Sequence, residues 1–122
     1  MRFMIFVRAT KSSESGVMPT QELIDAMGKF NQELIAAGIM HDGGGLKPSS
    51  HGARVTFSGN KREVRMGPFK PSKLVSGYWI WNCSSLEEAI SWVKRAPNPM
   101  PEDSKIEIRQ FFENEDFAPP SR

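Results

Sequence analysis

The chain reads Gly67-Pro68-Phe69-Lys70-Pro71, then Gly77-Tyr78-Trp79-Ile80-Trp81, then Ser84-Ser85-Leu86-Glu87-Glu88, and this stretch decides the fold. Its two prolines exclude a helix or a central strand and predict a loop. The aromatic run lies in the strongest strand pattern of the chain, from Val75 to Cys83. The serines and glutamates have capping-box spacing, Ser84 with Glu87 or Ser85 with Glu88, and predict a helix start. We therefore expect a loop, a strand and a helix in succession.

Hydrophobic periodicity and turn residues predict the elements on either side of this stretch. They are a strand at 3–8, a polar loop at 9–18, a helix from the N-cap Thr20 to Gly38, an extended segment from Ile39 broken by Gly43-Gly44-Gly45, an exposed or sheet-edge hairpin at 53–65, and a last strand at 105–112. The order β-α-β-hairpin-β-α-β predicts an α+β fold, a ferredoxin-like sandwich with two helices on one face of an antiparallel sheet.

The predicted strands carry apolar residues on both faces. Met4 and Phe6 alternate with Phe3 and Ile5, and the aromatic strand and the last strand show the same two-sided pattern. Two helices cover only one face, so the other would leave a large apolar patch on a monomer. We expect a second copy to cover it, which predicts a homodimer. Coverage by long loops or by the tail is the alternative.

Composition limits the classes of protein to which the chain can belong. Its 122 residues suit one domain, which we assign to residues 1–113, followed by a mobile acidic and Pro-rich tail at 114–122. The net charge of +2 comes from 16 basic and 14 acidic residues without a basic stripe, which argues against nucleic-acid binding. No apolar run is long enough for a membrane span. One cysteine, Cys83, indicates a reducing, cytoplasmic location.

Three polar residues before the hairpin are candidates for proton transfer. His41 and Asp42 are adjacent, and His51 follows ten residues later. A carboxylate beside an imidazole raises its pKa and can make it a general base. Neighbouring residues on an extended strand point to opposite faces, however, and solvated loop residues are the favoured interpretation. The same set is a weak metal-site pattern, so we predict no metal and no cofactor.

Cations and aromatic residues suggest an anion-binding cleft near the hairpin and the Gly67-Pro68-Phe69 loop. The candidates are Arg54, Arg65, Phe69, Lys70, Lys73, Trp79, Trp81 and Arg109. Ion pairing with Glu63 and Glu107 is the alternative for the arginines, and packing is the alternative for the tryptophans. Cys83 precedes the Ser84 helix start, but a buried, unreactive thiol is favoured.

Several motifs in order resemble the DGPF branch of the YCII-related proteins over nearly the whole chain. They are Gly45-Leu46-x-Pro48, Gly67-Pro68-Phe69 with Lys73, Gly77-Tyr78, the helix Leu86-Glu87-Glu88-Ala89-Ile90-Ser91-Trp92, Pro97, and Ile106-Glu107-Ile108-Arg109. Met66 stands where the family's tetrapeptide begins with Asp. The resemblance implies a ferredoxin-like fold, a dimeric α/β-barrel and a small-ligand cleft. Met27 and Ala96 stand near the positions of the His and Asp proposed as a catalytic pair in the YCII branch, so it implies no reaction.

The sequence leaves three functions open. The first is a homodimer that binds a small, anionic molecule near the hairpin. The second is an enzyme of lyase or isomerase type that uses His41, Asp42 or His51 for proton transfer. The third is a structural or regulatory dimer without a pocket. Whether the protein is an enzyme stays open at this point.

Overall fold

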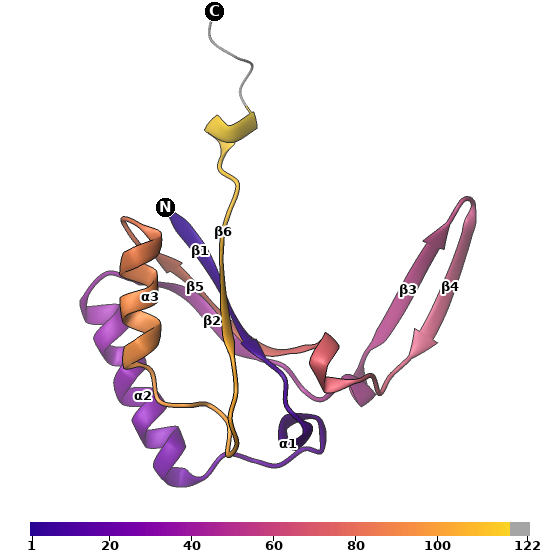
Figure 1. The fold of residues 1–122 in the computed structure, drawn as a ribbon, viewed down its shortest axis with the longest axis horizontal. Coiled ribbons are helices and arrows are strands. Elements are labelled where there is room, and N and C mark those ends of the chain that lie inside the picture. Colours follow the sequence, from indigo (N-terminus) through magenta and orange to yellow (C-terminus); the bar gives the residue numbers. More distant parts are fainter. Residues whose placement is uncertain (118–122) are drawn as a thin grey trace, which may run out of the picture.

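The aromatic strand β5 (Val75–Asn82) lies inside a four-stranded antiparallel sheet with the order β2-β5-β1-β6 (Figure 1). A computed structural model describes residues 1–117. Its other elements are β1 (Arg2–Arg8), α1 (Lys11–Glu14), α2 (Gln21–Ala36), β2 (Met40–Gly45), η1 (Ser49–His51), β3 (Ala53–Ser58), β4 (Lys61–Met66), η2 (Pro71–Lys73), α3 (Leu86–Arg95), β6 (Ile106–Gln110) and η3 (Asn114–Phe117). The α+β, ferredoxin-like prediction is confirmed.

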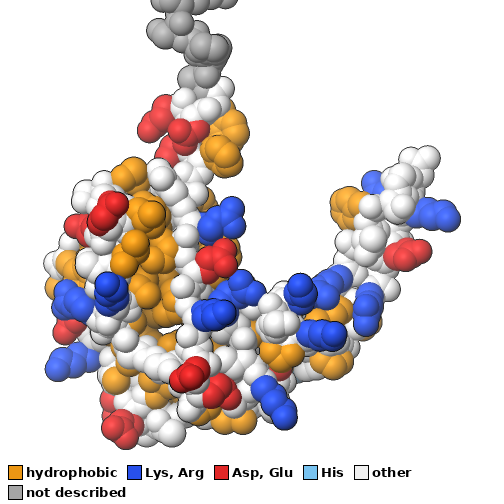
Figure 2. Space-filling view, in the orientation of Figure 1, with side chains coloured by type: hydrophobic (Ala, Val, Ile, Leu, Met, Phe, Trp, Pro, Cys, Tyr) orange, Lys and Arg blue, Asp and Glu red, His pale blue; other side chains and the backbone are white. Residues whose placement is uncertain are grey.

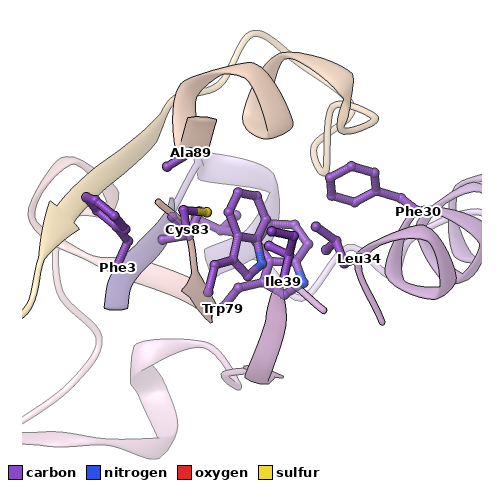
Figure 3. Close-up of a cluster of buried hydrophobic side chains, with 10 residues drawn as sticks. Phe3, Phe30, Leu34, Ile39, Trp79, Cys83 and Ala89 are labelled. Carbon is purple, nitrogen blue, oxygen red and sulfur yellow. The ribbon is translucent and has the colours of Figure 1, made fainter. Parts of the chain in front are cut away.

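The core lies between this sheet and the helices α2 and α3, which cover one of its faces (Figure 1). Phe3, Ile5 and Val7 point toward the helices because every second residue of β1 shares a face. Phe30 of α2 meets Trp79 edge to face, with ring centroids 6.0 Å apart. Figure 3 shows Phe30, Leu34, Trp79, Cys83 and Ala89 in this cluster. The aromatic strand therefore supplies the centre of the core.

Helix ends follow the signals in the sequence. The Thr20 side chain accepts a hydrogen bond from the Leu23 N–H, and Gly38 ends α2 at a φ of 72°. Of the two predicted capping boxes, the second is half formed: Ser85 is the N-cap of α3, but the return hydrogen bond to Glu88 comes from Ser84, one residue before the N-cap. Ser85 Oγ accepts from the Glu88 N–H, and the Glu88 carboxylate accepts from the Ser84 N–H.

Two local predictions are wrong. The loop predicted at 9–18 contains the one-turn helix α1, because Thr10 and Ser13 form a capping box within the serine-rich run. Residues 43–45 do not break the extended segment but belong to β2. A Cβ at Gly43 would lie 3.0 Å from Trp79 Cδ1, so the bulky ring on β5 requires a small neighbour.

In the part of the chain that the structure describes, the face of the sheet opposite α2 and α3 is uncovered, and we call it the open face. It consists of Met4, Phe6, Tyr78 and Ile80, which are half-buried, together with Arg8, Glu107 and Arg109 at the β6 side. The predicted two-sided pattern of β1 and β5 is therefore confirmed. In residues 1–117, neither α2 nor α3 lies on this face (Figure 1).

The hairpin β3–β4 forms a second, two-stranded sheet that projects from the rest of the chain (Figure 1). We call residues 53–66 the arm and the remaining described residues the body. Every residue of β3 and β4 is exposed, as the charged pattern predicts, and the arm is not an edge of the main sheet. Gly59 turns the hairpin with a φ of 57°.

The described part of the chain ends at residue 117, shortly after β6. Residues 114–117 of the predicted tail form a short 3-10 turn, and residues 118–122 lie outside the described residues. Within residues 1–117, none of the helices combines the length and apolar character that crossing a bilayer requires.

Candidate functional site at the root of the arm

Where the arm joins the body, six residues line an open cavity of about 360 Å³. They are Arg54, Arg65, Pro68, Phe69, Lys70 and Lys73. Five residues predicted from the sequence as ligand-binding are thus brought together, although they come from β3, β4, the loop and η2. Four of the six lining residues are cationic, and none is acidic.

The Phe69 ring organises two of these cations. Arg54 Cζ lies 3.9 Å from the ring centroid and Arg65 Cζ lies 5.9 Å from it. Both distances allow a cation–π interaction, which orients a guanidinium group without neutralising it. Arg54 and Arg65 are also directly opposite each other in the β3–β4 register. Like charges in this position repel, so the stacking on Phe69 holds together two groups that would otherwise separate.

Ser49 fixes the root of the arm to the body. The Phe69 N–H donates to Ser49 Oγ at 2.9 Å, and the Ser49 N–H donates to a Glu14 carboxylate oxygen at 2.9 Å. The Ser49 hydroxyl donates to the other Glu14 oxygen. Glu14 belongs to α1, so the short helix that the sequence did not predict positions the ring on which the arginines stack.

Gly67 permits the close approach that this arrangement needs. A Cβ at this position would lie 1.8 Å from the Ser49 carbonyl oxygen, which no side chain tolerates. The Gly67 N–H also donates to the Gly52 carbonyl oxygen at 3.0 Å. The glycine of the Gly67-Pro68-Phe69 motif is therefore required by the backbone contact between the two sides of the arm root.

A further contact ties η2, which carries Lys73, to the sheet. Arg8 Nη2 donates to the Ser72 carbonyl oxygen at 2.8 Å, while Arg8 Nη1 binds Glu107 at 3.0 Å. Sequence reasoning did not single out Glu14, Ser49 or Arg8. Each acts across a separation of 20 residues or more, so no local pattern marks them.

The candidates for proton transfer do not form a hydrogen-bonded set in residues 1–117. His41 occupies the irregularity in the β2–β5 register and is exposed, whereas Asp42 accepts a hydrogen bond from its own neighbour, the Gly43 N–H. His51 is exposed at the end of η1 and does not line the cavity. Within residues 1–117, no hydrogen bond joins these side chains, and no cluster of three metal-ligating groups occurs.

The remaining predicted residues lie elsewhere. Trp79 and Trp81 are 6% and 0% exposed in the core, so their rings pack under the helices and do not line the cavity. Arg109 is on the open face, where it lies 3.5 Å from Glu107, which is the ion pair given above as the alternative. Cys83 is buried, and burial raises the pKa of its thiol to about 11, which keeps it protonated and unreactive at neutral pH.

The charges at the cavity suit an anion. Among the described residues 1–117, Arg54, Arg65, Lys70 and Lys73 form no ion pair within 4.0 Å. Guanidinium groups present paired N–H donors that match carboxylate or phosphate oxygens, and ammonium groups add point charges. The half-buried Phe69 ring adds an apolar surface.

Comparison with known proteins identifies the family. The model of the YCII-related domain matches residues 1–113, almost the whole chain. A search of curated proteins found no match. The matched range ends at Glu113, whose carboxylate binds Arg2 at the start of β1 with an N–O distance of 3.0 Å. The match therefore includes every strand and α-helix described above.

Proposed function

We propose that this chain, which belongs to the YCII-related domain family, is a homodimer that binds a small carboxylate or phosphate compound in the cavity at the root of the arm. Family membership supplies the fold, and the cationic lining of the cavity supports the proposed class of ligand. A cytoplasmic location would suit the single buried thiol of Cys83.

One observation carries the binding proposal. Arg54 and Arg65 lie opposite each other in the hairpin, with Lys70 and Lys73 lining the same cavity. A directly opposed pair of like charges is destabilising, and no carboxylate within residues 1–117 forms an ion pair with either arginine. An anion bound between the two guanidinium groups would remove the repulsion and gain charge-assisted hydrogen bonds.

The homodimer is supported by the open face. Met4, Phe6, Tyr78 and Ile80 form a contiguous apolar surface across β1 and β5 because Met4 pairs with Ile80 and Phe6 with Tyr78. The charged residues beside it, Arg8, Glu107 and Arg109, carry both signs. A surface with both an apolar centre and alternating charges can pair with its own copy around a two-fold axis.

The test begins with native mass spectrometry of protein purified gently from its own host. It gives the subunit count and the mass of any small molecule that remains bound. Calorimetric titration with inorganic phosphate and with malonate then measures the affinity for two probe anions. Saturable binding of at least one anion is expected. A dimer that binds neither probe and carries no small molecule contradicts the binding proposal.

Two arginine variants that lose the same charge test whether the anion binds in this cavity. Arg54→Gln removes the guanidinium stacked closest to Phe69 and should weaken anion binding at least tenfold. Arg62→Gln is the matched control, since Arg62 lies on the same hairpin but stacks on Phe57 and does not line the cavity. Its effect should stay below twofold. Equal losses in both variants would mean that net charge, and not this cavity, attracts the anion.

A further inference from the structure

The arm has two chemically different faces. Since β3 and β4 pair in register, Val55 lies opposite Val64, and Ala53 lies opposite Met66, on one face. This face also carries Phe57, on whose ring Arg62 of β4 stacks. The opposite face carries Arg54, Thr56, Glu63 and Arg65. The apolar face therefore runs from the root of the arm to Phe57, and the arginines of the cavity project from the other side.

This apolar face is uncovered in the isolated chain. Its large side chains are 51% exposed at Val55, 71% at Phe57, 65% at Val64 and 67% at Met66. A two-stranded hairpin on its own is at best marginally stable in water, because it has no layer on which to bury its side chains. Four large apolar side chains on one face of such a hairpin indicate a surface that is covered in the assembled protein.

The position of the arm restricts what can cover it. The arm bends back and runs beside the open face of the sheet, on the side away from α2 and α3, with a wide gap between (Figure 1). Figure 2 shows hydrophobic side chains on the side of the arm that faces this gap. Two uncovered apolar surfaces of one chain thus face the same space.

A second copy of the chain fits this space better than an unrelated partner. The open face contributes four apolar side chains, whereas a stable interface buries roughly 800 Å² and about 20–30 residues on each side. Each arm strand has six residues and is thus about 20 Å long. The arm therefore offers a second contact surface, in addition to the open face and of similar length. In a two-fold dimer, each copy supplies both surfaces, so both arms would be used.

We propose that the arm is a clasp: a second copy enters the gap, packs its sheet on the open face, and is held by the apolar face of the arm. This inference rests on the homodimer proposed above and adds a second contact region to it. The cavity then lies at the root of the clasp, so anion binding and dimer closure meet at the same joint, where Ser49 and Phe69 connect arm and body.

Hydrogen exchange measured by mass spectrometry tests the clasp on the unmodified protein. The amide exchange of residues 53–66 is followed over a dilution series in which the dimer dissociates. Slower exchange of the apolar-face segments in the dimer than in the monomer is expected. Equal exchange in dimer and monomer overturns the clasp, even where the open face becomes protected.

Paired substitutions give a second test that leaves the body intact. Val55→Thr with Val64→Thr keeps the β-branched shape while removing apolar surface, and should raise the dimer dissociation constant at least tenfold. The matched control, Thr56→Ser with Glu63→Gln, alters the opposite face at neighbouring positions and should change it less than twofold. Sedimentation velocity provides the constants. An unchanged constant in the valine variant overturns the clasp.

The outcomes separate this inference from the proposed function. If the wild-type protein stays monomeric at all concentrations, both the proposed homodimer and the clasp are wrong. If the protein is a dimer but the amides of residues 53–66 exchange as fast as in the monomer, only the clasp is wrong. Binding of phosphate or malonate by the valine variant checks that the arm remains folded, since Arg54 and Arg65 lie on its other face.

Discussion

The body and the arm are built from the same alternating pattern, but only the body covers one apolar face of its sheet with its own helices. In the body, Phe3 and Ile5 of β1 are buried under α2 and α3, whereas Val55 and Phe57 of β3 are exposed. Alternation determines which side chains share a face, and it does not determine whether anything lies on that face. The difference supports the proposal that a second copy gives the arm the cover that the body obtains from its own helices.

The sharpest test of this comparison uses the same residue type in both regions. Phe3→Ala removes a ring that is 1% exposed and should cost about 3–5 kcal/mol of unfolding free energy. Phe57→Ala removes an exposed ring and should cost less than about 0.5 kcal/mol in the monomer. Urea unfolding, followed by circular dichroism at low protein concentration, gives both values. Similar costs at the two sites would mean that the arm belongs to the cooperative core.

The joint between the two regions is the second place to probe. Gly67→Ala places a methyl group against the Ser49 carbonyl and should cost about 1–3 kcal/mol through forced backbone movement. Anion binding should weaken with it, because Phe69 depends on Ser49. Gly45→Ala is the control, since a Cβ there meets nothing within 4 Å. Thermal unfolding and phosphate or malonate titration measure the two effects. A Gly67 variant that binds as the wild type does would show that the joint can move freely.

The smallest expected effect is the pH dependence of one ion pair in the body. The hydrogen bond and charge of Arg2 lower the pKa of the Glu113 carboxyl below its ordinary value of 4.5. Since the folded pKa is lowered, the stabilisation is complete above the unfolded pKa and is lost as the pH falls through the folded one. Glu113→Gln should therefore lower the melting temperature slightly at neutral pH, and the difference should vanish in acid.

Glu63→Gln in the arm is the control for this measurement. Glu63 forms no ion pair within residues 1–117, so the melting temperatures of this variant and the wild type should stay equal across the pH range. A pH-dependent difference of the same size in both variants would assign the effect to net charge instead of the Arg2 contact.

Much of the fold could be predicted from the sequence because its signals are local. Alternation in β1 and β5, the caps at Thr20 and Ser85, and Gly38 each act within a few residues. The missed helix α1 is also local, but Thr10 and Ser13 lie in a serine-rich run that favours turns equally well. The error at Gly43 has another cause, since the Trp79 ring that requires a glycine comes from a different strand.

The candidate site could be predicted only in part, because only some of its signals are local. Arg54 and Arg65 are recognisable as a cross-strand pair once the hairpin is predicted, and Phe69 and Lys73 lie in a motif. The aromatic residues Trp79 and Trp81 were equally suited to a ligand or to a core, and only their burial under α2 decides between these roles. Composition and spacing do not contain that information.

The sequence by itself determined the order of the main elements and the faces of the strands, because these depend on local sterics and periodicity. Only the tertiary structure decided that the hairpin stands apart as an arm and that four cations converge at its root. It also brought Glu14 to Ser49 across 35 residues of chain. Contacts of this kind depend on how whole elements pack, and packing distributes each interaction over residues that no local pattern connects.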